Sequence, residues 1–278
     1  APTASEVAAR AAAPAAPVVD EALAAVSRAV SSLAGIRPGA LFRLNVSPGW
    51  WMPPGEPIAG KPPGAEPALW IYGEIDVRQT AGDDWSQGGQ ADVAILSAKG
   101  DVITSYTVAV PAGSGSFLSR FPRSTDDVWL DPGAYAVRVR VRPVVGGLPT
   151  TDTARFELPK SPAAGVLLLG HPVYARRGTA ASAAVVATAD RRFRRTERIV
   201  IDASSTLKPD AVEAELLDRG GKPIAVTVTV TTIEKDQVTW VRSELPLAPL
   251  APGDYVIRMT AIRGNDRAVV LAAFRVVR

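Results

Sequence analysis

The sequence predicts an all-β fold: two tandem immunoglobulin-like antiparallel β-sandwich domains with a short N-terminal helix. Apolar and polar residues alternate along several segments after residue 36, a period typical of strands with one buried face. Part of the first half also recurs in the second half, with Tyr135 and Tyr255 lying 120 positions apart. Each repeat therefore predicts one sandwich, over residues 36–160 and 161–278, after an arm and helix over residues 1–35.

The N-terminal segment combines an arm with one amphipathic helix. Residues 1–17 are rich in alanine and proline and offer little apolar surface for a core. Residues 18–33 place large apolar side chains at steps of three and four, the period of a helix: Leu23, Val26, Val30 and Leu33. We expect this helix to dock on its own sandwich, and exchange of the helix between subunits is the alternative.

Strand patterns begin after Arg37 and continue through the first repeat. The clearest segments are 42–46, 69–77, 91–96, 102–110 and 134–141. Across the last of these segments and the residue after it, three arginines alternate with three valines: Arg138, Arg140 and Arg142 with Val137, Val139 and Val141. Because side chains alternate between the two faces of a strand, this segment is expected to bury one face and expose the other.

The internal repeat centres on the motif Leu-x-Pro-Gly-x-Tyr, which begins at Leu130 and again at Leu250. Two flanking pairs of segments match in nearly the same register: 93–100 with 214–221, and 154–158 with 272–276. Pro and Gly form a tight turn, and the tyrosine returns its hydroxyl to the backbone in the tyrosine corner of Greek-key sandwiches. Tyr135 and Tyr255 are therefore predicted structural corners, which indicate the fold and not the function.

The residues needed for common catalytic chemistry are scarce. The chain has no cysteine, which excludes thiol nucleophiles and disulfides, and His171 is its only histidine. Glu74 and Asp76 share a strand face at about 7 Å, the spacing of an inverting glycosidase pair, but acids on a solvent face are the commoner arrangement. We predict that the protein is not an enzyme and has no catalytic residue, cofactor or metal site.

Aromatic residues form the first candidate binding group. Five of the six tryptophans lie in the first repeat. Trp50, Trp51, Trp70 and Tyr72 are candidates for a platform on which sugars stack. The alternative is that these rings fill the core or cover a sheet edge or interface.

Basic residues of the second repeat form the other candidate binding group. Arg192, Arg194 and Arg195 lie in a cluster around Phe193, which would suit phosphate or an acidic polysaccharide. Pairing with neighbouring acidic residues of the same loop is the alternative. No groove-reading motif accompanies the cluster, so we predict no nucleic-acid partner.

The sequence resembles a known bacterial family in several segments. These are residues 188–199, 216–226 and 247–257 (Leu-Ala-Pro-Leu-Ala-Pro-Gly-Asp-Tyr-Val-Ile), with 36–39 and 69–76 in the first repeat. They are similar to the C-terminal β-sandwich region of secreted bacterial proteins that carry a von Willebrand factor A domain. The resemblance covers about residues 30–278 and implies an exported accessory or structural segment. The A domain itself is missing here, through removal or because this relative never had one.

Acidic loops offer three weak cation sites. Asp202-Ala-Ser-Ser-Thr resembles the Asp-x-Ser-x-Ser loop of an A domain, but no helix is expected after it, so a polar loop between strands is the favoured interpretation. Asp83-Asp84 and Asp126-Asp127 are interpreted as loop acids, with calcium as the alternative.

Location and partners follow from the ends and the charge of the chain. The start at Ala-Pro-Thr-Ala-Ser is typical of signal-peptidase cleavage, and a fragment of a longer protein is the alternative. No apolar run reaches the length of a membrane span. Residues 1–160 carry 14 basic and 16 acidic side chains, against 17 and 12 in residues 161–278, which favours contact between copies.

We therefore predict a non-enzymatic structural or assembly protein that is secreted, periplasmic or at the cell surface, as a subunit of an extracellular or cell-surface polymer. It is expected to contact itself or other surface proteins through its N-terminal arm and sheet edges. A carbohydrate-binding or adhesion module that uses the aromatic residues of the first repeat is the alternative.

Overall fold

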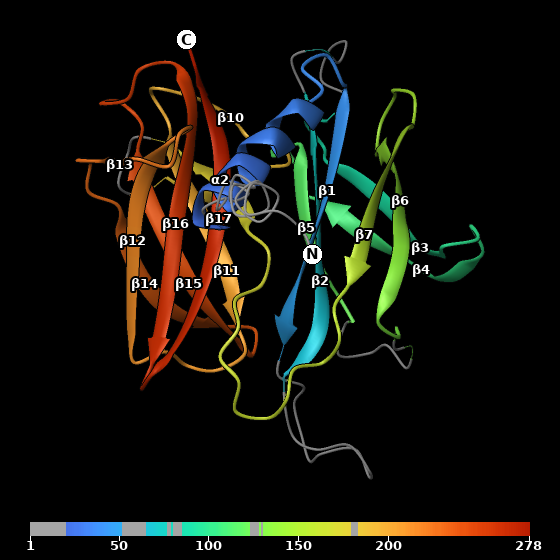
Figure 1. Cartoon of the computed structure of the whole chain (residues 1–278). Helices are drawn as coiled ribbons and strands as arrows, with labels where there is room; N and C mark the ends of the chain where they lie inside the picture. The colour runs from blue at the N-terminus through green and yellow to red at the C-terminus, as the bar shows by residue number, and fades with distance from the viewer. Residues whose placement is uncertain are drawn as a thin grey trace, which may run out of the picture.

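The computed structural model describes residues 21–51, 65–76, 79, 85–122, 128, 130–178 and 183–278. Over these residues the chain is nearly all-β, with one α-helix and four sheets, so the all-β prediction is confirmed (Figure 1). The sheets fall into two pairs. We call β1–β7 the first sheet pair and β8–β17 the second sheet pair.

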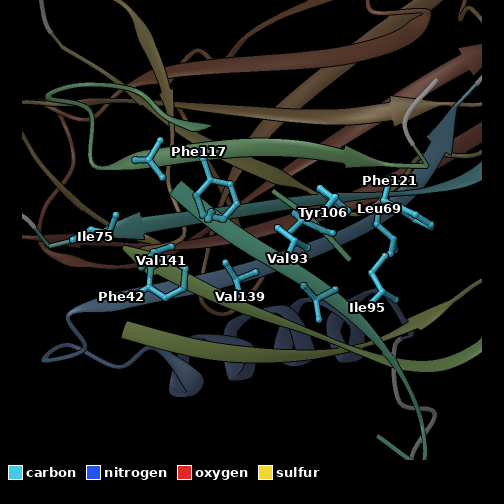
Figure 2. Close-up of a cluster of buried hydrophobic side chains, with 14 of the residues drawn as sticks. Phe42, Leu69, Ile75, Val93, Ile95, Tyr106, Phe117, Phe121, Val139 and Val141 are labelled. Carbon is cyan, nitrogen blue, oxygen red and sulfur yellow. The ribbon is translucent and has the colours of Figure 1, made fainter. Parts of the chain in front are cut away.

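The first sheet pair encloses one hydrophobic core. Its smaller sheet has the order β1-β2-β5, with β1 (Phe42–Trp51), β2 (Glu66–Ile75) and β5 (Ser116–Phe121). Its larger sheet has the order β4-β3-β6-β7, with β3 (Gly89–Ser97), β4 (Val102–Val110), β6 (Gly133–Pro143) and β7 (Thr150–Leu158). Figure 2 shows side chains of both sheets meeting in this core, among them Phe42, Leu69, Val93 and Val139.

Strand β6 shows how the sequence pattern produces the layer. Its three valines are fully buried in the core, and its three arginines are exposed on the outer face. The alternation predicted for residues 134–141 is therefore confirmed. It makes the larger sheet two-sided, with an apolar inner face and a polar outer face.

The second sheet pair encloses a separate core. One sheet has the order β14-β15-β11-β8-β9, with β8 (Val173–Arg177), β9 (Val185–Ala187), β11 (Arg198–Ser205), β14 (Thr229–Lys235) and β15 (Val238–Pro246). The other has the order β10-β17-β16-β12-β13, with β10 (Arg192–Arg194), β12 (Ala211–Asp218), β13 (Pro223–Ile224), β16 (Gly253–Arg263) and β17 (Asp266–Val277). Leu216, Ile257 and Phe274 lie fully buried between them.

The repeated segments occupy matching places in the two pairs. Tyr135 on β6 lies opposite Ser97 and Phe156, and its hydroxyl donates to the Asp131 carbonyl oxygen at 2.8 Å. In the second pair, Tyr255 on β16 lies opposite Asp218 and Phe274. Its hydroxyl donates to the Ala251 carbonyl oxygen, also at 2.8 Å. The two tyrosine rings stack on their phenylalanine neighbours with the same centroid distance of 5.8 Å.

The N-terminal helix α2 (Glu21–Ser31) continues into the short 3₁₀ helix η1 (Ser32–Gly35). Val26 and Leu33 are buried against the outer face of the second sheet pair, where they meet Leu217, Val256 and Ala273. The helix thus docks within its own chain, on the sheet pair that follows later in the sequence (Figure 1). No helix in the described part of the chain has the length and apolar character needed to cross a membrane.

Candidate functional site

The two sheet pairs meet along a buried junction. We define the junction as the contact between the β1-β2-β5 sheet and the β14-β15-β11-β8-β9 sheet. Its apolar part consists of Trp51, Ala68, Trp70 and Tyr72 from the first pair and Val173, Val238 and Trp240 from the second. Figure 1 shows β1 and β2 between the outer sheet of their own pair and the second sheet pair.

The aromatic residues singled out from the sequence lie at this junction. The exposed fractions of Trp50, Trp51, Trp70 and Tyr72 are 5%, 3%, 4% and 0%. Such burial leaves almost no ring surface open to solvent. In the structure the rings of Trp51, Trp70 and Tyr72 belong to the hydrophobic cluster between the sheet pairs, while the Trp50 ring is buried outside that cluster.

Specific contacts fix the aromatic part of the junction. The indole rings of Trp70 and Trp240 meet edge to face, with 4.7 Å between centroids. The guanidinium of Arg120 lies 4.1 Å from the centre of the Trp51 ring and donates a 2.9 Å hydrogen bond to the carbonyl of Asp236. Such arrangements add directional contacts to the burial of apolar area.

Polar groups near the centre of the junction are paired across it. The Trp50 amide donates to the Ser204 hydroxyl at 2.9 Å, and the His171 amide donates to the Pro48 carbonyl at 2.8 Å. Ser47 donates to the Pro172 carbonyl at 2.6 Å. These hydrogen bonds orient the two sheet pairs and satisfy backbone and hydroxyl groups at the junction.

Two titratable groups there, the buried Tyr72 hydroxyl and the His171 imidazole, have shifted pKa values. Burial raises the pKa of the Tyr72 hydroxyl, which accepts a 2.9 Å hydrogen bond from the Asn45 amide. Partial removal from water lowers the pKa of the His171 imidazole, although part of this residue still faces solvent. Both shifts favour the neutral form, so neither group adds charge to the junction at neutral pH.

An ion-pair network forms the other end of the junction. Arg176 lies 3.5 Å from Glu74 and 3.1 Å from the Glu197 carboxylate. Asp190 pairs with Arg192 at 2.7 Å and with Arg43 at 3.8 Å. The structure thus brings the predicted acidic strand residues and part of the predicted basic cluster together, although they are more than 100 positions apart in sequence.

The network is electrically balanced. A cavity of about 310 Å³ at this end is lined by four arginines and four acids: Arg43, Arg176, Arg192, Arg194, Glu74, Asp76, Asp190 and Glu197. The remaining member of the predicted basic group, Arg195, donates to the Ala248 carbonyl at 2.6 Å. Because each arginine lies near an acid, the cavity has no net charge with which to attract an anion.

A cleft of about 700 Å³ opens beside the aromatic part of the junction. Its apolar lining includes Trp70, Val173 and Trp240. Its polar lining includes Asp202 and Arg242, which form two parallel hydrogen bonds of 2.7 Å. This combination of an apolar floor with a few fixed polar groups is typical of small-molecule sites.

The segment that resembles a cation loop lies in strand β11 and not in a loop. Asp202 is paired with Arg242, and the Ser204 hydroxyl accepts from Trp50. The Thr206 hydroxyl accepts from the Leu168 amide and donates to the Val166 carbonyl. Within the described residues, no group of three or more His, Cys, Asp or Glu side chains is placed to hold a metal ion. Asp83-Asp84 and Asp126-Asp127 lie outside the described residues.

Strand β4 is a functional candidate that sequence reasoning did not single out. It forms an outer edge of the first sheet pair, and its sequence Val-Ile-Thr-Ser-Tyr-Thr-Val-Ala-Val has neither charge nor proline. A bulge opposite Ile95 and Leu96 interrupts its pairing near Ile103, leaving regular pairing over 104–110. Its place at the edge depends on the order of the strands in the sheet, and the sequence of a single segment does not predict that order.

The other outer strands of the described sheets are protected in the ways that natural edges usually are. The longer ones carry charge or proline: Arg43 and Pro48 on β1, Arg120 on β5, Asp152, Arg155 and Glu157 on β7, and Glu234 and Lys235 on β14. Strands β9, β10 and β13 have three, three and two residues. Charge, proline and shortness all hinder pairing with another chain, and β4 is the one edge of the described sheets that has none of these three features.

Comparison of the sequence with models of known protein families and with curated proteins finds no match. The resemblance to the region that follows a von Willebrand factor A domain therefore stays a prediction. The function has to be argued from the junction, the cleft and the β4 edge.

Proposed function

We propose that this chain is a non-enzymatic, exported structural protein that assembles into an extracellular or cell-surface polymer. We also propose that its sheet pairs are tandem immunoglobulin-like domains. The matching tyrosine corners and the strand order β1-β2-β5 against β4-β3-β6-β7 support this assignment. The buried junction supports a rigid building block, because polar and aromatic contacts hold the two pairs together.

The β4 edge is the observation that carries the assembly proposal. An exposed, uncharged strand offers a row of backbone donors and acceptors to a strand of another chain. Each added hydrogen bond contributes about 0.5–1.5 kcal/mol net. We assign the partner as β4 of a second copy, paired antiparallel, because no like charges would then face each other.

A polymer also needs a second kind of contact. Pairing of two β4 edges is two-fold and closes after two copies. We assign the second contact to the N-terminal arm and helix, over residues 1–35. The exposed Leu23 of α2, with 47% of its surface accessible, provides an apolar position for such a contact.

The experiment measures the mass of the full chain in solution by sedimentation velocity. The variant Ala109→Lys places a charge on the exposed outer face of β4, which is how natural edge strands hinder pairing with another chain. The matched control is Thr153→Lys, at an exposed position on the already charged edge strand β7. We expect large assemblies of the native chain and of the control, and smaller species, held by the N-terminal contact alone, in Ala109→Lys. A native chain that stays monomeric at high concentration would contradict the proposal.

A second candidate is a carbohydrate-binding or adhesion module, which the cleft favours. The paired Asp202 and Arg242 line the cleft together with Trp70 and Trp240, so a sugar there would meet fixed hydrogen-bonding groups and the small exposed part of each ring. A glycan array with the native chain and with Arg242→Gln tests this. Binding that disappears in the variant would support it, and an array without binding would reject it.

A further inference from the structure

The turn between β6 and β7 exposes an unusual amount of apolar surface. The exposed fractions of Leu148, Val144 and Val145 are 88%, 64% and 61%, the highest of the large apolar side chains described. Gly146 and Gly147 between them adopt positive φ angles of 66° and 64°, which a tight turn requires. The turn therefore presents three apolar side chains at the end of a stiff hairpin.

These side chains have no packing role within the described chain. None belongs to a hydrophobic cluster of either sheet pair, and Figure 1 shows β6 and β7 on the side of the first pair that is remote from the second. Contiguous exposed apolar residues on a soluble surface usually mark a contact with a partner or a membrane.

The strands that lead to this turn are basic. From residue 133 to 151 the chain contains three arginines and no acid. Arg142 is 53% exposed and lies 3.7 Å from Asp92, whereas Arg138 and Arg140 have no ion pair with any described residue. With a rise of about 3.3 Å per residue, Arg142 lies roughly 7 Å and Arg140 roughly 13 Å along the strand from the first apolar residue of the turn, whereas the screening length in physiological salt is about 8 Å.

We infer that the β6–β7 turn docks on an anionic lipid bilayer. Val144, Val145 and Leu148 enter the boundary between headgroups and acyl chains, while Arg142 and Arg140 contact lipid phosphates. The three apolar side chains of the turn match the apolar interior of such a bilayer. The arginines on the strand behind them match its anionic surface. This inference is independent of the β4 contact, because the exposed outer edge of β4 and the turn use different residues.

The size of the tip argues for a bilayer rather than a protein. A stable protein interface buries about 800 Å² on each partner, with shape complementarity over some 20 residues. Three apolar side chains on a turn provide far less. A bilayer needs no complementary shape and receives small apolar tips directly.

The test is co-sedimentation of the full chain with vesicles of phosphatidylcholine, with and without phosphatidylglycerol, at low and high salt. We expect binding to the anionic vesicles only, weakened by salt. Leu148→Ser should weaken binding about tenfold, because it removes the most exposed apolar side chain. Arg140→Gln and Arg142→Gln should each weaken it about fivefold.

Matched controls separate this contact from general stickiness. Val269→Ser removes an apolar side chain that is 55% exposed on β17, and Arg155→Gln removes an exposed charge on the same sheet face, further from the turn. Both should bind like the native chain. The vesicle assay is repeated on Ala109→Lys, so that loss of assembly and loss of lipid binding are scored separately.

Two outcomes would overturn the inference. One is failure of the native chain to sediment with anionic vesicles. The other is binding that Leu148→Ser leaves unchanged, which would indicate attraction of a polyanion to arginines alone. Urea unfolding should show that Leu148→Ser is as stable as the native chain, because the side chain has no packing contact to lose. A loss of binding in this variant would then not come from unfolding.

Discussion

Tyr135 and Tyr255 close equivalent corners of the two sheet pairs, because each hydroxyl donates a 2.8 Å hydrogen bond to the carbonyl oxygen four positions earlier. Each ring also stacks on a phenylalanine of the next strand at 5.8 Å. Two segments that are 120 positions apart thus build the same turn from the same residues. The corner fixes the start of a central strand in each pair.

Removal of either hydroxyl should destabilise the protein by a modest and similar amount. In Tyr135→Phe and Tyr255→Phe the ring stays stacked and only the hydrogen bond is lost, which costs about 0.5–1.5 kcal/mol. Urea denaturation of the two single variants measures the change in the free energy of unfolding. A loss in one variant without a loss in the other would show that the corners are not equivalent.

The sequence predicted what depends on short-range pattern. Alternation along residues 134–141 indicated which face of β6 is buried, and the repeated motif indicated the corner tyrosines. Both follow from local geometry, because strand periodicity and turn chemistry are properties of neighbouring residues.

The candidate site depends on contacts that no local pattern contains. Trp70 meets Trp240, which is 170 positions away, and Glu74 reaches Arg176 across the junction. An amphipathic pattern predicts that a face of α2 is buried, but it does not say that Val26 packs on the second sheet pair. In the same way, the composition of β4 was visible in the sequence, while its place at an edge required the strand order.

Substitution of Gly49 should loosen the junction. A β-carbon at this position would clash with Ser204 and with the Trp70 ring, both of which are buried. Gly49→Ala is therefore expected to cost about 1–3 kcal/mol, the range for overpacking of a well-packed interior. Small-angle scattering should show a larger radius of gyration if the sheet pairs separate.

The matched control for the junction is Gly39→Ala, where an added β-carbon meets nothing within 4 Å. This variant should keep the stability and dimensions of the native chain. Equal behaviour of the two alanine variants would contradict close packing at Gly49.

Truncation of Leu33 should weaken the docking of the N-terminal helix. Leu33 is 1% exposed and lies against Leu217, Val256 and Ala273 of the second sheet pair. Leu33→Ala leaves a cavity there and should lower the free energy of unfolding by about 2–5 kcal/mol. Leu23→Ala is the control, because Leu23 on the same helix is 47% exposed and its truncation should cost less than about 0.5 kcal/mol.

Acid should weaken the junction through Asp190. Burial raises the pKa of this carboxyl, but hydrogen bonds from Arg192 and the charge of Arg43 outweigh burial and leave the pKa below its ordinary value. Between the folded and the unfolded pKa, the unfolded chain binds the additional proton, so stability falls as the pH falls. The stabilisation by the ionised Asp190 carboxylate is complete above about pH 4, the ordinary pKa of an Asp side chain. It disappears as the pH drops through the pKa of the folded state.

The measurement is the free energy of unfolding of the native chain and of Asp190→Asn, from neutral pH to below pH 4. The native chain should be the more stable of the two at neutral pH, because the variant leaves Arg192 without its 2.7 Å carboxylate partner. The difference should shrink on acidification, since the native carboxyl becomes neutral as well. Arg192→Gln should also reduce the acid dependence, because it removes the donors that lower the pKa of Asp190. A difference that stays constant down to the lowest pH would show that the ionised carboxylate does not stabilise the junction.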